Sequence, residues 1–248
     1  EEAVRAALEA IRAGFAREVE RGGVTREQAA AALERISPAA GLAAAVTGAE
    51  LVIEAVPESL DLKRRIFGEL DRLAPRGALL ASNTSSLSIG LIAEATSRPE
   101  RVVGLHFFNP AHRMPLLEVV RGERSSDETL REAVALGRRL GKEPIVVQDA
   151  PGFATSRLGL VLGLEAMRMV EQGVASPEEI DKAMTLGYGH PVGPLRLTDL
   201  VGLDVRLAIA EHLHRELGGT AFEPPEILRS MVAEGRLGRK SGRGFYEW

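Results

Sequence analysis

Short apolar runs that alternate with amphipathic segments occupy the first 148 residues, and this alternation constrains the fold more than any other feature. The clearest run is Leu-Val-Ile-Glu-Ala-Val at 51–56, ended by Pro57, which is typical of a strand buried on both faces of a parallel sheet. Alternating strands and helices predict a doubly wound α/β sheet, mainly parallel, with an edge of mixed direction. The other strands are predicted at 78–81, 102–105, 116–120 and 145–147.

Helical spacing of apolar residues predicts the helices of this first half. The segment 1–21 forms one helix and Gly22-Gly23 ends it. Thr25 and Gln28 then match a capping box that opens a second helix at 26–34. Ser59 caps a further helix whose apolar face reaches Leu73. The remaining helices are expected just after Gly41, over 87–95 and over 126–140.

The second half is predicted to be helical, because no strand pattern follows Asp149-Ala150-Pro151-Gly152. A long apolar helix covers 153–172, and Ser176-Pro177-Glu178-Glu179 opens the next one with a cap, a proline and acids in its first turn. The last two helices are expected over 195–217 and 224–234. We therefore expect an α/β domain at 1–148 and an all-α domain at 149–248.

The helix at 153–172 carries apolar residues on nearly every side, so it must be buried on more than one side. A domain of this size could cover only part of that surface alone, which favours a homodimer formed through the helical domain. A central helix within a monomeric bundle is the alternative.

Composition narrows the possible function. The chain of 248 residues has no cysteine, which excludes disulfides, thiol catalysis and cysteine-ligated metals. Its net charge of −4 gives no bulk attraction to nucleic acid or anionic membranes. No apolar run reaches the ~20 residues of a membrane span, and the N-terminus does not resemble a signal peptide. We expect a cytoplasmic protein without membrane or nucleic-acid partners. The spacing of its histidines predicts no metal site.

The segment Gly104-Leu105-His106-Phe107-Phe108-Asn109-Pro110 carries the clearest chemical signal. It lies at the carboxyl end of a predicted strand, where open α/β sheets bind ligands, and histidine can act as a general base near neutral pH. Twelve residues later, Glu118 stands in an apolar run and needs a partner. Pairing with His106 would satisfy the glutamate and orient the imidazole. On spacing alone, a core histidine and an edge-strand glutamate are the more frequent arrangement.

Two further polar segments follow neighbouring strands. Ser82-Asn83-Thr84-Ser85-Ser86 is by itself a turn and helix cap, but it lies one strand from His106. Glu58 follows the strand at 51–56, with Lys63 one turn into the next helix. Glu58 could accept hydrogen bonds from a ribose, although a solvated loop acid is the commoner case.

Taken together, these segments resemble the L-3-hydroxyacyl-CoA dehydrogenase family over essentially the whole chain. The matching segments are Glu54 to Glu58, Ala81 to Leu87, Gly104 to Pro110, Pro151-Gly152-Phe153, Leu186 to Pro194 and Gly238 to Tyr246, in that order. Any one of these motifs would be weak evidence of the family, but six in sequence make chance similarity very unlikely.

The resemblance implies NAD-dependent oxidation of a 3-hydroxyacyl-CoA to the 3-oxoacyl-CoA, and the reverse. His106 would be the general base, with Glu118 as its orienting partner. Ser85 and Asn109 would bind the substrate oxygen or the nicotinamide end of NAD. The implied cofactor contacts also include Glu58, Lys63 and Lys240, and Ser156 stands where the family usually has an asparagine that contacts substrate.

One departure concerns the start of the fold. The family begins with a strand, a Gly-x-Gly-x-x-Gly turn, a helix and a second strand, and no such glycine pattern occurs in these 248 residues. We therefore expect an incomplete Rossmann-type doubly wound sheet followed by an all-α C-terminal domain, with the strand at 51–56 lacking a neighbour. Two alternatives remain: a dehydrogenase of a non-CoA hydroxy acid or sugar acid, and a non-catalytic dimeric remnant.

Overall fold

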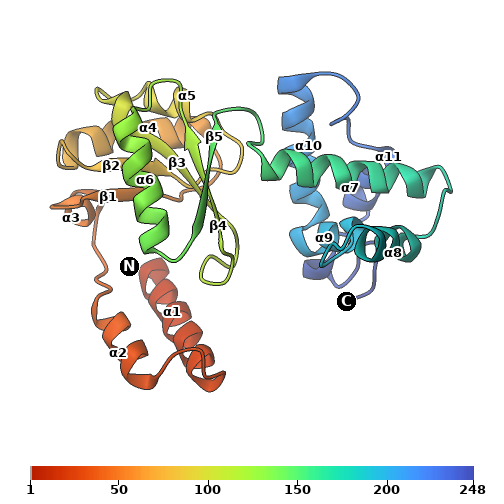
Figure 1. The fold of residues 1–248 in the computed structure, drawn as a ribbon, viewed down its shortest axis with the longest axis horizontal. Coiled ribbons are helices and arrows are strands. Elements are labelled where there is room, and N and C mark those ends of the chain that lie inside the picture. Colours follow the sequence, from red (N-terminus) through yellow and green to blue (C-terminus); the bar gives the residue numbers. More distant parts are fainter. Residues whose placement is uncertain (1) are drawn as a thin grey trace.

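A computed structural model describes residues 2–248 of the chain. It has two lobes: a five-stranded sheet with its helices, and a group of helices that follows it in sequence (Figure 1). A helical hairpin of α1 (Glu2–Glu20) and α2 (Arg26–Glu34) projects from the sheet lobe. The capping box at α2 is present as predicted, because Thr25 and Gln28 exchange side-chain and backbone hydrogen bonds.

The sheet has the strand order β1-β2-β3-β4-β5 and is mixed, as expected. Three of its neighbouring pairs are parallel, whereas β3 and β4 are antiparallel. The strands are β1 (Leu51–Glu54), β2 (Leu79–Ser82), β3 (Val102–Phe107), β4 (Leu116–Arg121) and β5 (Glu143–Gln148).

Two details of the strands correct the sequence-based expectations. The strand predicted at 51–56 does not lack a neighbour, since β1 pairs in parallel with β2. It is also not buried on both faces: most of its residues are partly exposed, and it forms one edge of the sheet. The strand predicted at 102–105 continues to Phe107, which places His106 inside the sheet rather than in the loop beyond it.

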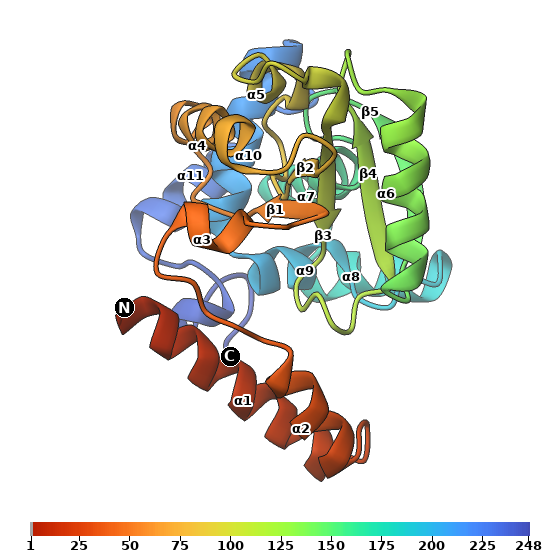
Figure 2. The same ribbon diagram turned by 90° about the vertical axis from the view of Figure 1, so that its left-hand side faces the viewer.

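Helices cover both faces of the sheet, with α4 on one side and α6 on the other (Figure 2). On the α4 side, Phe67, Ile89 and Ile92 pack on Leu80 and Val120. On the α6 side, a second cluster includes Val103, Leu105 and Leu130. The helices of this lobe are α3 (Leu42–Val46), α4 (Leu60–Leu73), α5 (Ile89–Ala93), the 3-10 turn Pro99–Arg101 and α6 (Asp127–Arg139).

The helical lobe has its own core and departs from the prediction at one point. The helix expected over 195–217 is two helices, because Gly202 interrupts it with a φ of 107°. Only glycine adopts that backbone conformation without strain. The helices are α7 (Thr155–Glu171), α8 (Pro177–Gly187), α9 (Pro194–Val201), α10 (Leu203–Leu217), α11 (Glu226–Ala233) and the 3-10 turn η2 (Arg239–Ser241).

A buried carboxylate fastens the C-terminal segment to this lobe. Asp199 accepts hydrogen bonds from the backbone N–H groups of Phe245 and Tyr246, both at 2.9 Å, and from the indole Nε1 of Trp248 at 2.8 Å. The Tyr246 hydroxyl donates to Asp181 at 2.7 Å. Since α9 supplies Asp199 and α8 supplies Asp181, the chain end holds these two helices together.

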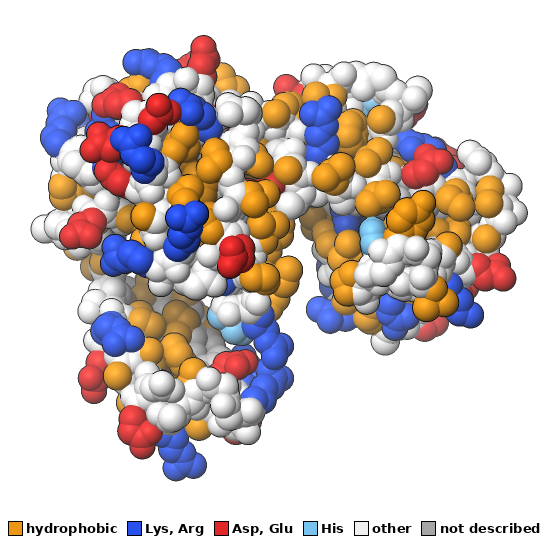
Figure 3. Space-filling view, viewed as in Figure 1, with side chains coloured by type: hydrophobic (Ala, Val, Ile, Leu, Met, Phe, Trp, Pro, Cys, Tyr) orange, Lys and Arg blue, Asp and Glu red, His pale blue; other side chains and the backbone are white. Residues whose placement is uncertain are grey.

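Hydrophobic side chains also reach the surface of the helical lobe (Figure 3). Within residues 2–248, no helix combines the length and the apolar character needed to cross a membrane. The large exposed apolar side chains of this lobe include Leu158, Leu162, Leu186, Tyr188, Leu197, Val201 and Val205.

Candidate active site

The candidate site lies at the carboxyl ends of the parallel strands β1, β2 and β3. Glu54 ends β1, Ser82 ends β2, and His106 is the penultimate residue of β3. Ligands of open α/β sheets bind at these strand ends, where loops from several strands converge. The fold therefore brings three polar segments, far apart in sequence, to one edge of the sheet.

His106 and Glu118 form a buried pair across the antiparallel strands. They are direct register partners in β3 and β4, and the His106 Nδ1 lies 2.7 Å from the Glu118 Oε2. Glu118 is fully buried, and β4 lies between β3 and β5, so this glutamate does not belong to an edge strand. The geometry matches the paired arrangement that the residue types suggested.

Glu118 is also bonded to the helical lobe. Its Oε1 accepts hydrogen bonds from the N–H groups of Ala154 and Thr155, and its Oε2 accepts one from the Thr155 hydroxyl at 2.8 Å. Burial alone would raise the pKa of Glu118, but the hydrogen bonds from His106 and Thr155 outweigh it and hold the pKa below its ordinary value. The start of α7 therefore stabilises the ionised carboxylate.

Thr155 and Ala154 were missed by the sequence reasoning. Both are local residues at a helix start, and nothing in their spacing indicates a bond to a strand 36 or 37 positions earlier. The only signal was the predicted helix start close behind Asp149-Ala150-Pro151-Gly152, because helix N-terminal N–H groups require acceptors.

Aromatic rings enclose one side of His106. The ring centroid of Phe108 lies 4.6 Å from that of His106, and the centroid of Phe153 lies 5.9 Å away. The His106 Nδ1 is hydrogen-bonded to Glu118, which leaves Nε2 as the ring nitrogen on the other side of the imidazole. An imidazole that donates from Nδ1 to a carboxylate has Nε2 available as a proton acceptor.

The turn after β2 is held by side chains on both of its sides. Asn83 accepts a hydrogen bond from the Phe107 N–H at 2.9 Å, which ties the turn to the end of β3. Glu58 accepts hydrogen bonds from the Thr84 hydroxyl at 2.5 Å and from the Ser85 N–H at 3.1 Å. Sequence reasoning named Ser85 and Glu58 but gave Asn83 and Thr84 no role beyond the turn.

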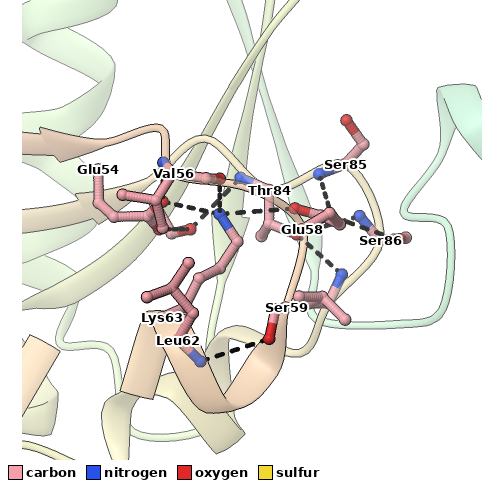
Figure 4. A network of polar contacts seen from close by, with 11 residues as sticks. Glu54, Val56, Glu58, Ser59, Leu62, Lys63, Thr84, Ser85 and Ser86 are labelled. Atoms are coloured by element: carbon pink, nitrogen blue, oxygen red, sulfur yellow. Dashed lines mark hydrogen bonds and ion pairs between the residues drawn. The ribbon is translucent and has the colours of Figure 1, made fainter. Parts of the chain in front are cut away.

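Lys63 lies beneath this turn, shielded from solvent (Figure 4). Its ammonium lies 2.7 Å from Glu54, 3.1 Å from the Val56 carbonyl and 3.5 Å from Glu58. Glu54 was quoted only as part of a motif, yet it is the nearest acceptor of Lys63. A buried ion pair between a strand end and a helix cannot be inferred from either local pattern.

The remaining predicted site residues lie in three different places. Asn109 begins the exposed loop after β3, directly behind the histidine segment. The Ser156 hydroxyl donates to the backbone carbonyl of Ser85 at 3.5 Å, across the two lobes. Lys240 lies in η2 and pairs with Asp204 of α10. Within residues 2–248, no hydrogen bond or ion pair joins Lys240 to the His106 cluster.

No group of three or more His, Asp or Glu side chains in residues 2–248 is placed to hold a metal ion. The site therefore consists of one buried His–Glu pair, a hydroxyl-rich turn and a half-exposed carboxylate, Glu58.

Comparisons with known proteins find one family along almost the whole chain. The family model described as the NAD binding domain of 3-hydroxyacyl-CoA dehydrogenase matches residues 1–150, and the model of its C-terminal domain matches 152–248. A probable 3-hydroxybutyryl-CoA dehydrogenase of Bacillus subtilis is 45% identical over 247 residues, which are 100% of this chain and 86% of that protein. The mitochondrial hydroxyacyl-coenzyme A dehydrogenase of Sus scrofa is 42% identical over 87% of this chain and 69% of its own length.

Solved structures give the same result. The crystal structure of (S)-3-hydroxybutyryl-CoA dehydrogenase from Ralstonia eutropha superposes with a TM-score of 0.95 at 40% identity, covering 100% of this chain and 87% of that one. Both lobes, and the segments that carry His106, Glu118 and Ser85, fall within the matched length.

Proposed function

The chain belongs to the 3-hydroxyacyl-CoA dehydrogenase family, a family of NAD-dependent dehydrogenases, and we propose that it interconverts L-3-hydroxyacyl-CoA and 3-oxoacyl-CoA with His106 as the general base. The observation that carries the proposal is the buried His106–Glu118 pair at the carboxyl end of β3. Relatives that act on CoA thioesters, by their names, support the substrate class.

The residues present fit the nicotinamide riboside part of NAD, which lies next to the reacting carbon. Glu58 is half exposed, with 42% of its side chain open, and stands beside the turn that holds Ser85. A carboxylate in this position can accept hydrogen bonds from ribose hydroxyls. Bound NAD would supply the hydride acceptor, and the protein supplies binding, orientation and electrostatics. Ser85 and Asn109 are the proposed donors to the substrate oxygen or the nicotinamide end.

The proton step follows from the hydrogen bonds of the histidine. Glu118 accepts from Nδ1, so in the neutral imidazole the lone pair lies on Nε2, which can take the proton of the 3-hydroxyl. When the proton is taken, the charge of Glu118 stabilises the imidazolium. The bonds from Thr155 and Ala154 hold the carboxylate still, so neither member of the pair needs to reorganise during the reaction.

The substrate class is tested by following NADH absorbance with acetoacetyl-CoA and, separately, with free acetoacetate. The proposal predicts oxidation of NADH with the thioester at a kcat/KM at least about a hundredfold higher than with the free acid, since contacts remote from the reacting carbon contribute binding free energy. Equal rates would favour a dehydrogenase of non-CoA acids. Loss of both rates in a folded protein would refute the proposed reaction.

The same proposal includes a homodimer formed through the helical lobe. Leu158, Leu162 and Leu197 are among the apolar side chains exposed there, and unpaired apolar surface of this kind favours association. Light scattering of the purified chain should give twice the mass of 26.6 kDa, and Leu158→Arg should lower it. A monomer at micromolar concentration would remove the dimer from the proposal.

A further inference from the structure

The two carboxylate oxygens of Glu118 have different partners. The Oε1 accepts hydrogen bonds from the N–H groups of Ala154 and Thr155, at 3.1 Å and 3.0 Å. The Oε2 faces the His106 Nδ1 at 2.7 Å and also accepts from the Thr155 hydroxyl at 2.8 Å. The imidazole and the hydroxyl therefore share one oxygen, and they reach it from the two different lobes.

The hydroxyl is not required to hold the carboxylate in place. The N–H groups at the start of α7 already fix Oε1, and any residue other than proline at position 155 would supply the same backbone donor. Valine has nearly the shape of threonine and would make that backbone bond without any bond to Oε2. What threonine adds is one donor, directed at the oxygen that also faces the general base.

Sharing this oxygen changes how strongly Glu118 favours a protonated histidine. A carboxylate stabilises an imidazolium beside it, because opposite charges attract. Burial opposes the ionisation of Glu118, but the hydrogen bonds from His106 and Thr155 keep its pKa below the ordinary value. A hydroxyl that donates to Oε2 satisfies part of the negative charge there, so less remains to stabilise an imidazolium. The hydroxyl therefore favours the neutral imidazole, which is opposite to the effect of Glu118.

The surroundings of the pair add no competing charge. Within residues 2–248, the one ion pair of His106 is with Glu118 of β4. The neighbouring rings of Phe108 and Phe153 are uncharged, and α7 presents the uncharged Thr155 to the pair. The Thr155 hydroxyl is therefore the group placed to adjust the balance between the two protonation states.

We propose that Thr155 is a positioning residue that tunes the general base: by sharing the Glu118 Oε2 with His106, its hydroxyl widens the pH range in which the imidazole is neutral and can take a proton. Thr155 acts through Glu118 and touches neither cofactor nor substrate. The consequence for turnover rests on the proposed function, whereas the effect on the titration of His106 does not.

The primary test follows the His106 imidazole by NMR between about pH 5 and pH 9 in the nucleotide-free protein, in the parent and in Thr155→Val. The signal is identified by its absence in His106→Gln. Without the hydroxyl, the imidazolium should persist to higher pH, and the midpoint of the titration should rise by about half a pH unit. Thr155→Ser keeps the hydroxyl and should restore the parental midpoint.

Turnover provides a second readout, because oxidation of L-3-hydroxybutyryl-CoA by NAD needs the unprotonated base. The acid limb of the pH profile of kcat/KM reports the base of the free enzyme. In Thr155→Val this limb should move to higher pH by the same half unit, which lowers kcat/KM about threefold on the limb and less as the pH rises. Thr198→Val is the matched control, since it removes a buried hydroxyl of the same lobe that has no hydrogen-bond partner within residues 2–248. It should leave both midpoints unchanged.

An unchanged or lower NMR midpoint in Thr155→Val would overturn the inference, and so would a shift of equal size in Thr155→Ser. Thr155→Ala removes the same hydroxyl and gives the same test if valine does not fit beside Glu118. If the NMR midpoint rises as described but the parent protein does not oxidise the substrate, the tuning role stands and the proposed function fails.

Discussion

Replacing Glu118 with glutamine is the perturbation with the sharpest expected outcome, because it keeps the shape of the side chain and changes only its charge and its hydrogen-bonding capacity. Glu118 accepts from four donors: the Ala154 and Thr155 N–H groups, the Thr155 hydroxyl and the His106 Nδ1. A glutamine has one acceptor oxygen. With that oxygen on the two N–H groups, its NH₂ faces His106 and Thr155.

The amide then favours the other neutral tautomer of the histidine. Its NH₂ must donate to Nδ1, so the neutral imidazole carries its proton on Nε2 and that nitrogen cannot accept the substrate proton. We expect kcat to fall by about 10²–10⁴-fold, the range over which a positioned general base contributes. A hydrogen bond to a charged group contributes about 1.5–3 kcal/mol, so one or two lost bonds should lower the free energy of unfolding by about 2–4 kcal/mol.

Two measurements check this prediction: steady-state NADH oxidation with acetoacetyl-CoA, and urea unfolding between pH 3 and pH 7. The folded pKa of Glu118 lies below 4.5, so its stabilisation is present above that value and is lost as the pH falls through the folded pKa. The glutamine variant should lose this part of the acid sensitivity. Thr155→Val is the control, because it removes the hydroxyl that donates to the Glu118 Oε2 but leaves the carboxylate to accept from the His106 Nδ1. A glutamine variant whose kcat stays within about threefold of the parent would refute the role of the pair.

Three further substitutions test the packing. Asp199→Ala should lower the free energy of unfolding by about 2–4 kcal/mol, since it leaves three partly buried donors of the C-terminal segment without their acceptor; a loss below about 0.5 kcal/mol in urea unfolding would contradict this. Gly104→Ala should cost about 1–3 kcal/mol, because its Cβ would lie 2.7 Å from the Cβ of Val120 and 3.0 Å from the Cδ1 of Ile89; an unchanged Tm would show that the sheet relaxes there. Arg206→Met should stabilise the fold by about 1–3 kcal/mol at pH 7, because burial lowers the pKa of Arg206 to about 10 and its Nε finds no acceptor within residues 2–248. The folded parent binds fewer protons than the unfolded chain above that pKa, so the advantage of the variant should shrink as the pH rises through about 10; a lower Tm for the variant at pH 7 would contradict the reasoning.

Local features were predictable from the sequence because their cause is local. The capping box at Thr25 and the cap with proline at Ser176 and Pro177 start their helices where the pattern indicated. The alternation of strands and helices gave the mixed sheet. The spacing of His106 and Glu118 left their pairing open, and only the antiparallel register of β3 and β4 shows that the two side chains face each other.

Long-range features were not predictable, since their cause lies in packing between distant segments. Nothing in the sequence around Gly202 indicates its φ of 107°, the conformation that separates α9 from α10. Thr155 meets Glu118 only because the helical lobe docks on the sheet. The neighbours of Lys63 are a further example, since no local pattern indicates that Glu54 and the Val56 carbonyl lie beside its ammonium.

The most direct test of the central claim compares kcat for NADH oxidation by acetoacetyl-CoA in the parent protein and in His106→Ala, with NADH affinity measured in both. The imidazole lies against Glu118 and the aromatic rings of Phe108 and Phe153, and proton transfer is the single role proposed for it. We predict a loss of at least about 10²-fold in kcat with NADH affinity kept within a few-fold. A variant that turns over at nearly the parental rate would show that another group moves the proton and would contradict the account.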